Sequence, residues 1–310
     1  MRTTKPATPF LEKLRRSGIE FPSWMAAPET PQRDLVPLAS MNALGKSARP
    51  LAKVAARGLA NPTRAAAPSQ SKRVDIDLRR LAAMGYITPA QTRSRIGDEF
   101  RVVKRPLLSA VQSGPAPTAR TNLLMVTSSM PREGKTFVAV NLAISIAMEL
   151  DKTVLLVDAD VSRPSVLKRL RLAESPGLLD LLTDASLRMP DVLLNTNIAK
   201  LSILPSGAPR GHATELLASD SMRRLLDELS SRYADRIVVF DAPPLLPSTE
   251  SRVLATHMGQ VILVIEASQT SHRTVAQAMA SIESCPVVLP LLNKIDQSEV
   301  GSFSGYYVPR

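Results

Sequence analysis

The stretch "LLMVTSSMPREGKTFVAVNLA", from Leu123 to Ala143, decides the fold. A run of apolar residues is typical of a buried strand, a small polar bend follows, and Gly-Lys-Thr opens a long apolar helix. In this setting Ser129-x-x-x-x-Gly134-Lys135-Thr136 matches the outline of a phosphate-binding loop, with serine where many such loops have their first glycine. The stretch therefore predicts a strand–loop–helix unit that binds nucleotide phosphates.

The physical chemistry of such a loop gives its residues separate tasks. Backbone N–H groups and the dipole of the following helix attract phosphate, Lys135 reaches the β- and γ-phosphates, and the Thr136 hydroxyl is a ligand for Mg²⁺. Gly134 stands where a Cβ would obstruct the phosphate. We expect the whole loop and the first helical turn to contact the nucleotide: Ser129, Met130, Pro131, Arg132, Glu133, Gly134, Lys135, Thr136 and Phe137.

Strands and helices alternate along the rest of the chain. Apolar runs without polar alternation are typical of a parallel sheet that is covered on both faces. They occur at 122–128, 153–159, 200–206, 235–242, 260–267 and 286–292, and helical patterns between them include 134–150, 221–233 and 271–283. We predict an α/β fold with a doubly wound, mostly parallel sheet of the P-loop NTPase type, whose ligands gather at the carboxyl ends of the strands.

The composition limits what surrounds this domain. Residues 1–73 hold 13 Lys/Arg, 4 Asp/Glu and 9 of the 25 prolines, which predicts a basic, disordered tail. The single cysteine, Cys285, excludes an internal disulfide framework, and no apolar run approaches the roughly 18–20 residues of a membrane span. We also expect no secretory signal and hence a soluble, intracellular protein, because the N-terminus has no apolar core segment.

Between the tail and the domain we predict a helical segment over residues 74–112, then a linker. Thr88 is the expected N-cap of its main helix, and Pro106 is expected to bend or end it. The P-loop domain then covers residues 121–298, and residues 299–310 form a flexible, tyrosine-bearing tail.

Two further predicted strands end in carboxylates beside the phosphate loop. The run "TVLLVD" ends in Asp158-Ala159-Asp160, and "RIVVFD" ends in Asp241. Carboxylates at this edge suit a metal ion held through water and a base for a hydroxyl nucleophile. Taken singly, each also fits an ordinary helix cap or strand end, but their order along the chain favours the nucleotide site.

The motifs "SSMPREGKT", "LLVDADVSRPSV" and "VVFDAPP", with the C-terminal "GSFSGYYVPR", resemble the bacterial tyrosine autokinases that control exopolysaccharide and capsule synthesis. These are relatives of the MinD/ParA ATPases, and the segment "GYITP…DEFRVVKRPLL" looks most like the branch encoded with exosortase. The resemblance implies that Lys135 and Thr136 bind ATP and Mg²⁺. It implies that Asp160 and Asp241 support the metal and that Asp158 activates the attacking tyrosine.

The same resemblance gives tasks to residues outside the loop. Tyr306 and Tyr307 become the phosphate acceptors, presented to a neighbouring subunit, and Asn293 is expected near the adenine. Asp98, Arg101 and Lys104 match the family's Glu-x-x-Arg-x-x-Arg subunit contact, with lysine in place of the last arginine. One departure is Glu266, at a strand end where the family leads us to expect arginine.

The implied partners follow from the family. They are a membrane chain-length-determinant protein as activator, further copies of the chain, and a cognate tyrosine phosphatase, with no nucleic acid. The expected location is the cytoplasm, at the inner face of the plasma membrane through that partner. One alternative is a MinD/ParA-type positioning ATPase, although Met130 stands where those proteins carry a second lysine. Another is a GTPase, because "NKID" at 293–296 has the form of a guanine-reading motif.

Overall fold

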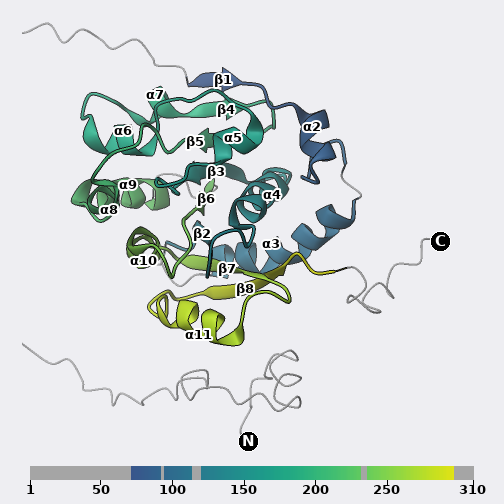
Figure 1. Cartoon of the computed structure of the whole chain (residues 1–310). Helices are drawn as coiled ribbons and strands as arrows, with labels where there is room; N and C mark the ends of the chain where they lie inside the picture. Colours follow the sequence, from purple (N-terminus) through teal and green to yellow (C-terminus); the bar gives the residue numbers. More distant parts are fainter. Residues whose placement is uncertain (1–70, 92–93, 114–119, 232–235, 297–310) are drawn as a thin grey trace, which may run out of the picture. The chain divides into compact units, whose positions relative to one another are not determined.

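The computed structural model describes residues 71–91, 94–113, 120–231 and 236–296, and within these ranges eight strands form one sheet (Figure 1). The strand order is β1-β4-β5-β3-β6-β2-β7-β8. All neighbours are parallel except β4 and β5, which are antiparallel. The prediction of a mostly parallel, doubly wound sheet is confirmed. The strands are β1 (Lys72–Val74), β2 (Leu123–Ser128), β3 (Thr153–Asp158), β4 (Leu194–Thr196), β5 (Leu201–Leu204), β6 (Arg236–Asp241), β7 (Gln260–Glu266) and β8 (Val288–Asn293).

Helices cover both faces of this sheet (Figure 1). One face carries α2 (Leu78–Ala83), α3 (Arg95–Ser113), α4 (Lys135–Ala147) and α5 (Val166–Leu170). The other carries α6 (Leu178–Thr183), α7 (Met189–Val192), α8 (Ala213–Leu217), α9 (Asp220–Ser231), α10 (Thr249–Ala255) and α11 (His272–Ala280). In the ranges that the structure covers, no helix combines the length and the apolar character needed to span a bilayer.

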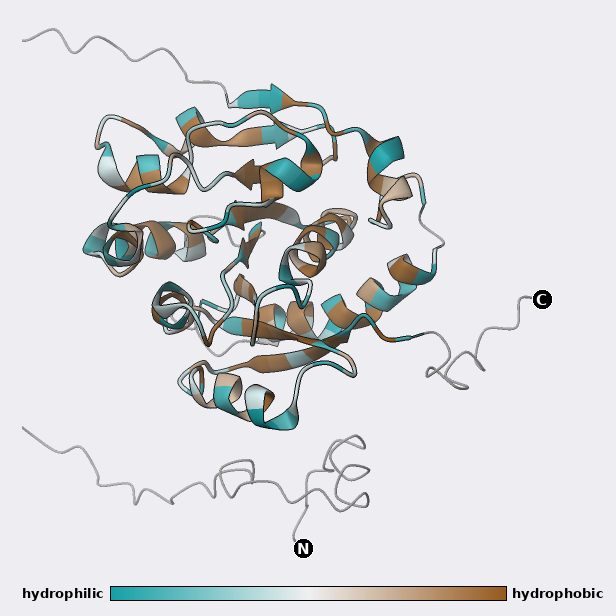
Figure 2. Cartoon of the chain, in the orientation of Figure 1, coloured by the Kyte–Doolittle hydropathy of each residue, from teal (hydrophilic) through white to brown (hydrophobic). Residues whose placement is uncertain are grey.

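The central strands are apolar throughout because both of their faces are buried. In β2, Leu124 and Val126 pack on the α4 side while Leu123 and Met125 pack on the opposite side, and all four are fully buried. Figure 2 shows the corresponding pattern, with hydrophobic strands in the middle and hydrophilic residues on outward helix surfaces. The unbroken apolar runs of the sequence are thus the signature of a sheet packed on both sides.

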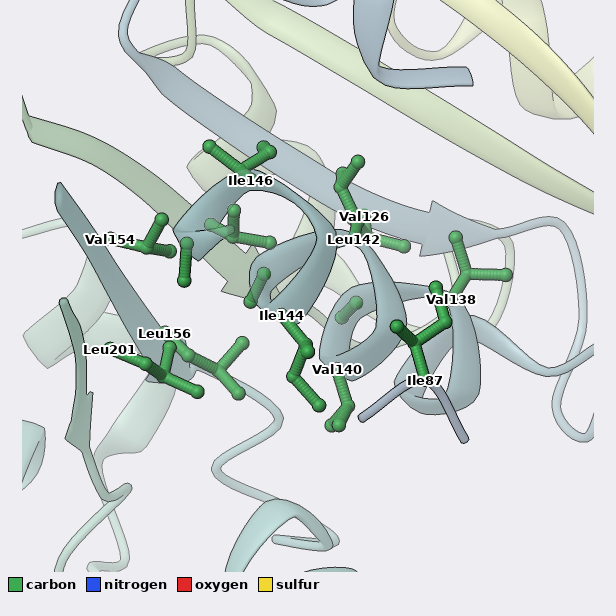
Figure 3. Packing of buried hydrophobic residues seen from close by; sticks show 14 of the residues in the cluster. Ile87, Val126, Val138, Val140, Leu142, Ile144, Ile146, Val154, Leu156 and Leu201 are labelled. Atoms are coloured by element: carbon green, nitrogen blue, oxygen red, sulfur yellow. The ribbon is translucent and has the colours of Figure 1, made fainter. Parts of the chain in front are cut away.

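Helix α4, which follows the P-loop, is itself enclosed by the core (Figure 3). Eleven of its thirteen residues are buried, and its apolar side chains pack among Val126, Val154, Leu156 and Leu201. The buried Asn141 is hydrogen-bonded at both ends of its amide, because its Oδ1 accepts the N–H of Ile87 at 2.7 Å and its Nδ2 donates to a carbonyl of its own helix. This packing fixes the helix whose first turn forms part of the site.

Helix α3 differs from the prediction at both ends. It begins at Arg95, and the hydroxyl of the preceding residue, Ser94, accepts the N–H of Gly97. Thr88 lies outside the helix, where its carbonyl accepts the N–H of Gln91 in a turn. It also continues through Pro106 to Ser113. The prediction that Thr88 caps this helix is therefore wrong, and Pro106 does not end it.

The sheet extends further toward the N-terminus than predicted. Strand β1 pairs in parallel with β4, so Lys72 and Arg73 belong to the sheet although their positions fall in the range predicted as tail. Both strands have only three residues, too few to show a hydrophobic period. The rest of the predicted basic tail and the predicted C-terminal tail from residue 299 lie outside the described residues.

Candidate functional site

The loop between β2 and α4 has a tight backbone conformation. Arg132 and Gly134 have positive φ angles of 74° and 100°. Gly134 is the N-cap of α4, and no side chain caps that end of the helix. The first N–H groups of α4 therefore face the loop without a side-chain partner, and together with the helix dipole they form a ready anion site.

Side chains from three elements meet in front of this helix end. The Lys135 ammonium lies 2.6 Å from Asp160 Oδ2, and the Thr136 hydroxyl donates to Asp241 Oδ2 at 2.7 Å. These aspartates reach the site because β3 and β6 are adjacent parallel strands, in a register that pairs Asp158 directly with Asp241. The structure thus brings together the three aspartates predicted for the site, Asp158, Asp160 and Asp241.

Asp158 is held in a different way from its neighbours. Its Oδ2 accepts the N–H groups of Ser165 and Val166 at 3.0 and 2.9 Å, so it caps the short helix α5. Its Oδ1 is buried and has no hydrogen-bond partner, and the same is true of Oδ1 of Asp241. A helix cap and a carboxylate available for chemistry are therefore combined in one residue.

Burial and mutual repulsion shift the acid–base behaviour of this cluster. Burial, reinforced by the charge of Asp241, raises the pKa of Asp158 to about 7. Burial also raises the pKa of Asp241 to about 6, although Lys135 and the Thr136 hydrogen bond act in the opposite direction. Burial alone would lower the pKa of Lys135, but Asp241 and Asp160 outweigh it and raise that pKa. The lysine therefore stays charged in the site.

The donor set fits a small divalent cation that brings its own further ligands. Among the described residues, no group of three or more His, Cys, Asp and Glu side chains is arranged to hold a metal by itself. Mg²⁺ usually takes one or two carboxylates and completes its shell with water and phosphate oxygens. The unpartnered Asp241 Oδ1, beside the Thr136 hydroxyl, supplies such an oxygen pair.

A cleft of about 450 Å³ opens in front of the loop. Its wall includes predicted residues of the loop, of the first turn of α4 and of the acidic cluster, namely Pro131, Arg132, Gly134, Lys135, Thr136, Phe137 and Asp160. It also includes Ser165, Arg169 and Pro243, which the sequence reasoning did not single out. Ser165 and Pro243 belong to the motifs "LLVDADVSRPSV" and "VVFDAPP", but nothing in the sequence indicates that Arg169 lines the cleft.

Four predicted nucleotide contacts lie outside the wall of this cleft. The Ser129 hydroxyl is buried without a hydrogen-bond partner, and Met130 is exposed. Glu133 is buried and accepts the N–H of Met130 at 2.7 Å. Asn293 donates from Nδ2 to the Glu133 carbonyl at 2.9 Å, behind the loop. The next residue of "NKID", Lys294, also donates to a loop carbonyl, so both side chains hold the loop.

The predicted subunit contact on α3 is only partly exposed. Asp98 and Arg101 are at the surface and pair with each other. Lys104 is buried instead, 2.6 Å from a carboxylate oxygen of Glu149 and 2.6 Å from the carbonyl of Ser145. The Lys104 side chain does not reach the surface beside the other two, because its ammonium is bound by the Ser145 carbonyl of α4 and by Glu149 just after that helix. Tyr306 and Tyr307 lie outside the described residues.

Comparisons with known proteins agree with this architecture. A family profile described as an AAA domain matches residues 132–289, half of the chain. The tyrosine-protein kinase YwqD of Bacillus subtilis is 33% identical over 162 residues, which are 52% of this chain and 67% of the relative. The chain belongs to the family of bacterial P-loop tyrosine kinases.

Two further similar proteins extend the comparison. The succinoglycan biosynthesis transport protein ExoP of Rhizobium meliloti is 30% identical over 61% of this chain. The solved kinase domain of VpsO is 28% identical, with a TM-score of 0.51, and the match covers 63% of this chain and 99% of that one. This chain spans about a quarter of the length of ExoP and of some other relatives that it matches.

Proposed function

We propose that this chain transfers the γ-phosphoryl group of ATP to tyrosine hydroxyls, with Tyr306 and Tyr307 of a neighbouring copy as acceptors. The observation that carries this proposal is the state of Asp158, which has one oxygen fixed by α5 and the other buried without a partner. A carboxylate whose pKa is raised to about 7 is well matched to accept a proton near neutral pH. Membership of the kinase family supports the same chemistry.

The acceptor would approach Asp158 from a second cleft. That cleft, also of about 450 Å³, has Asp158 in its wall together with apolar side chains such as Leu167 and Leu172. It has room for a phenol ring, and its wall shares no residue with the wall of the cleft that Lys135 lines. Nucleotide and acceptor would thus reach the reacting centre by separate routes.

The reaction follows from this arrangement. The phenolic proton passes to Asp158 Oδ1, and the phenol oxygen forms a bond to the γ-phosphorus. The bond from that phosphorus to the β–γ bridging oxygen breaks, and ADP leaves. Lys135 exchanges its contact with Asp160 for the phosphate oxygens, and the N–H groups of α4 stabilise the charge of the transferred group. Mg²⁺, held by Thr136, Asp160 and Asp241, would neutralise phosphate charge.

The context of the reaction is also proposed from the relatives. The name of ExoP describes a transport protein of polysaccharide biosynthesis, and much of its length lies outside the part that this chain matches. We therefore assign this kinase to the regulation of exopolysaccharide or capsule export. A membrane chain-length-determinant protein would activate it at the inner face of the plasma membrane. The chain would form homo-oligomers, with a cognate phosphatase removing the phosphate.

The test is incubation of the purified chain with γ-labelled ATP and Mg²⁺, followed by mass-spectrometric mapping of the label. Lys135→Met and the double variant Tyr306→Phe/Tyr307→Phe are compared with Lys200→Met. Lys200 donates to the carbonyls of Glu149 and Leu150, remote from the loop, and serves as the control.

Label on the C-terminal tyrosines that disappears in the first two variants and persists in Lys200→Met supports the proposal. ATP hydrolysis without protein label, with the partner's cytoplasmic segment present, would contradict it and favour a positioning ATPase. Competition by GTP as strong as by ATP would contradict the assignment of ATP.

A further inference from the structure

The phosphate-binding loop contains a buried glutamate, Glu133, whose carboxylate accepts a backbone hydrogen bond from the same loop. Glu133 is 2% exposed, and one oxygen of its carboxylate accepts the N–H of Met130 at 2.7 Å. The Met130 carbonyl in turn accepts the Ser128 hydroxyl at 2.7 Å. A buried carboxylate needs hydrogen bonds to both oxygens, because each unsatisfied oxygen is costly away from water. The second oxygen of Glu133 therefore needs a partner.

That partner comes from a distant part of the chain. The Thr270 hydroxyl, in the segment between β7 and α11, donates to the other oxygen of Glu133. The two residues are 137 positions apart in the sequence. The conformation of the loop is thus connected to the segment that follows β7.

Residues after β7 and β8 hold the same loop from outside. Lys294 donates to the Arg132 carbonyl at 2.8 Å and forms an ion pair with Glu266, the last residue of β7, at 3.0 Å. Asn293, the last residue of β8, donates to the Glu133 carbonyl. A Cβ at Gly134 would lie 2.1 Å from the Asn293 amide nitrogen, so the two segments are in close contact.

We propose that Thr270, Lys294 and Glu266 form a brace that positions the phosphate-binding loop. None of the three lines the cleft in front of the loop, so they act through Glu133 and Arg132. The brace keeps the backbone N–H groups aimed at the phosphates before the nucleotide arrives, which lowers the ordering cost of binding. It also explains Glu266, whose carboxylate holds the lysine that contacts the loop.

This inference rests on the proposed function in one respect, that the loop binds nucleotide phosphates. Its first test is the affinity of the full chain for Mg²⁺–ADP, measured by calorimetry for Thr270→Val, which keeps the shape and removes the donor. Losing a hydrogen bond to a charged group predicts about 5- to 20-fold weaker binding. Thr270→Ser restores the donor and should restore the affinity.

Matched controls separate the brace from general stability. Thr256 also donates its hydroxyl to a backbone carbonyl, that of Val253, but far from the loop. Lys200 has a positive φ like Lys294 and also donates to carbonyls. We expect Lys294→Met to weaken binding by about 2- to 5-fold, because its ion pair is partly exposed, and Lys294→Arg to recover part of that loss. Thr256→Val and Lys200→Met should leave the affinity unchanged.

A second readout does not depend on the nucleotide. Amide hydrogen exchange of the peptide that covers residues 129–134 should rise roughly threefold or more in Thr270→Val without ligand, but not in Thr256→Val. Equal affinities and equal exchange in Thr270→Val and the unchanged chain overturn the brace. If neither the unchanged chain nor Lys135→Met binds Mg²⁺–ADP, the proposed function fails, and the exchange measurement still decides the brace.

Discussion

Lys135 Nζ lies 2.6 Å from Asp160 Oδ2, so the lysine expected to hold phosphates is paired with an acid. Both side chains are largely buried, and the pair forms at the point where β3 ends and α4 begins. A buried charge that loses its partner is strongly destabilising, so this pairing stabilises the site. Under the proposed function, binding of a phosphate would exchange one anionic partner of Lys135 for another.

This exchange predicts the behaviour of Asp160→Asn. The amide cannot hold the ammonium as an ion pair, so Lys135 is released and ADP without metal should bind equally well or a few-fold more tightly, on the order of 0.5–1 kcal/mol. The gain from added Mg²⁺ should disappear, because Asp160 is a proposed metal ligand. Calorimetric titration of ADP with and without Mg²⁺ measures both effects. Metal-free binding that weakens tenfold would contradict the competition between Asp160 and phosphate.

Asp158→Asn tests the proposed base separately from nucleotide binding. The amide oxygen can still accept the N–H groups of Ser165 and Val166, so the cap of α5 and the affinity for Mg²⁺–ADP should persist. Removing a general base should lower the rate of autophosphorylation by about 10²- to 10⁴-fold. The exposed Asp184→Asn is the control, with a rate equal to that of the unchanged chain. A rate within threefold for Asp158→Asn would rule out its role as base.

The sequence predicts the parts of this site that depend on local pattern. The apolar run that ends at Ser128 and the bend before Lys135 are enough to place an anion site at the N-terminus of α4. The pairing of Asp158 with Asp241 depends on β3 and β6 being neighbours. The order of strands in a sheet depends on tertiary packing. The sequence therefore indicates which carboxylates lie at the carboxyl ends of the strands, but not which of them are neighbours.

Residues whose tasks depend on long-range contacts could not be found from the sequence. Lys104 follows Arg101 at the same three-residue step by which Arg101 follows its surface partner Asp98. The packing of α3 nevertheless directs this lysine toward α4. Glu266 and Lys294 are 28 positions apart and meet only because β7 and β8 are paired in parallel. Helix periodicity identifies a face, but only packing decides whether a charged residue on it reaches solvent.

Because Lys104 is buried, we predict that its replacement lowers the free energy of unfolding rather than disturbing contacts between subunits. Lys104→Met removes the donor to the buried Ser145 carbonyl and leaves the partly exposed Glu149 without its partner, so unfolding in urea should show a loss of about 1–2 kcal/mol. Arg95→Met breaks the exposed pair with Glu99 and should cost about 0.5 kcal/mol or less. A stability of Lys104→Met equal to that of Arg95→Met would show that Lys104 is not buried in solution.

The environment of Asp180, in α6 on the face of the sheet opposite to α4, predicts that the stability of the fold depends on pH. The Asp180 carboxylate accepts the N–H groups of Gly177 and Ala208 at 3.0 and 3.1 Å and pairs with Arg210 at 2.9 Å. Burial alone would raise the pKa of Asp180, but the Gly177 N–H and Arg210 outweigh it, and the pKa is lowered. A folded-state pKa below the unfolded one means that the contribution is complete above the unfolded value and is lost as pH falls through the folded value.

Asp180→Asn should therefore lose about 1–2 kcal/mol of unfolding free energy at pH 7, because its amide cannot replace the charged hydrogen bonds. The difference from the unchanged chain should narrow as pH falls below about 4, near the unfolded pKa of aspartate, since protonated Asp180 then resembles asparagine. Urea unfolding between pH 7 and pH 3.5 measures this. Asp220→Asn, whose carboxylate is exposed, should differ little from the unchanged chain at any pH. A difference for Asp180→Asn that stays constant over this range would show that the carboxylate charge contributes nothing.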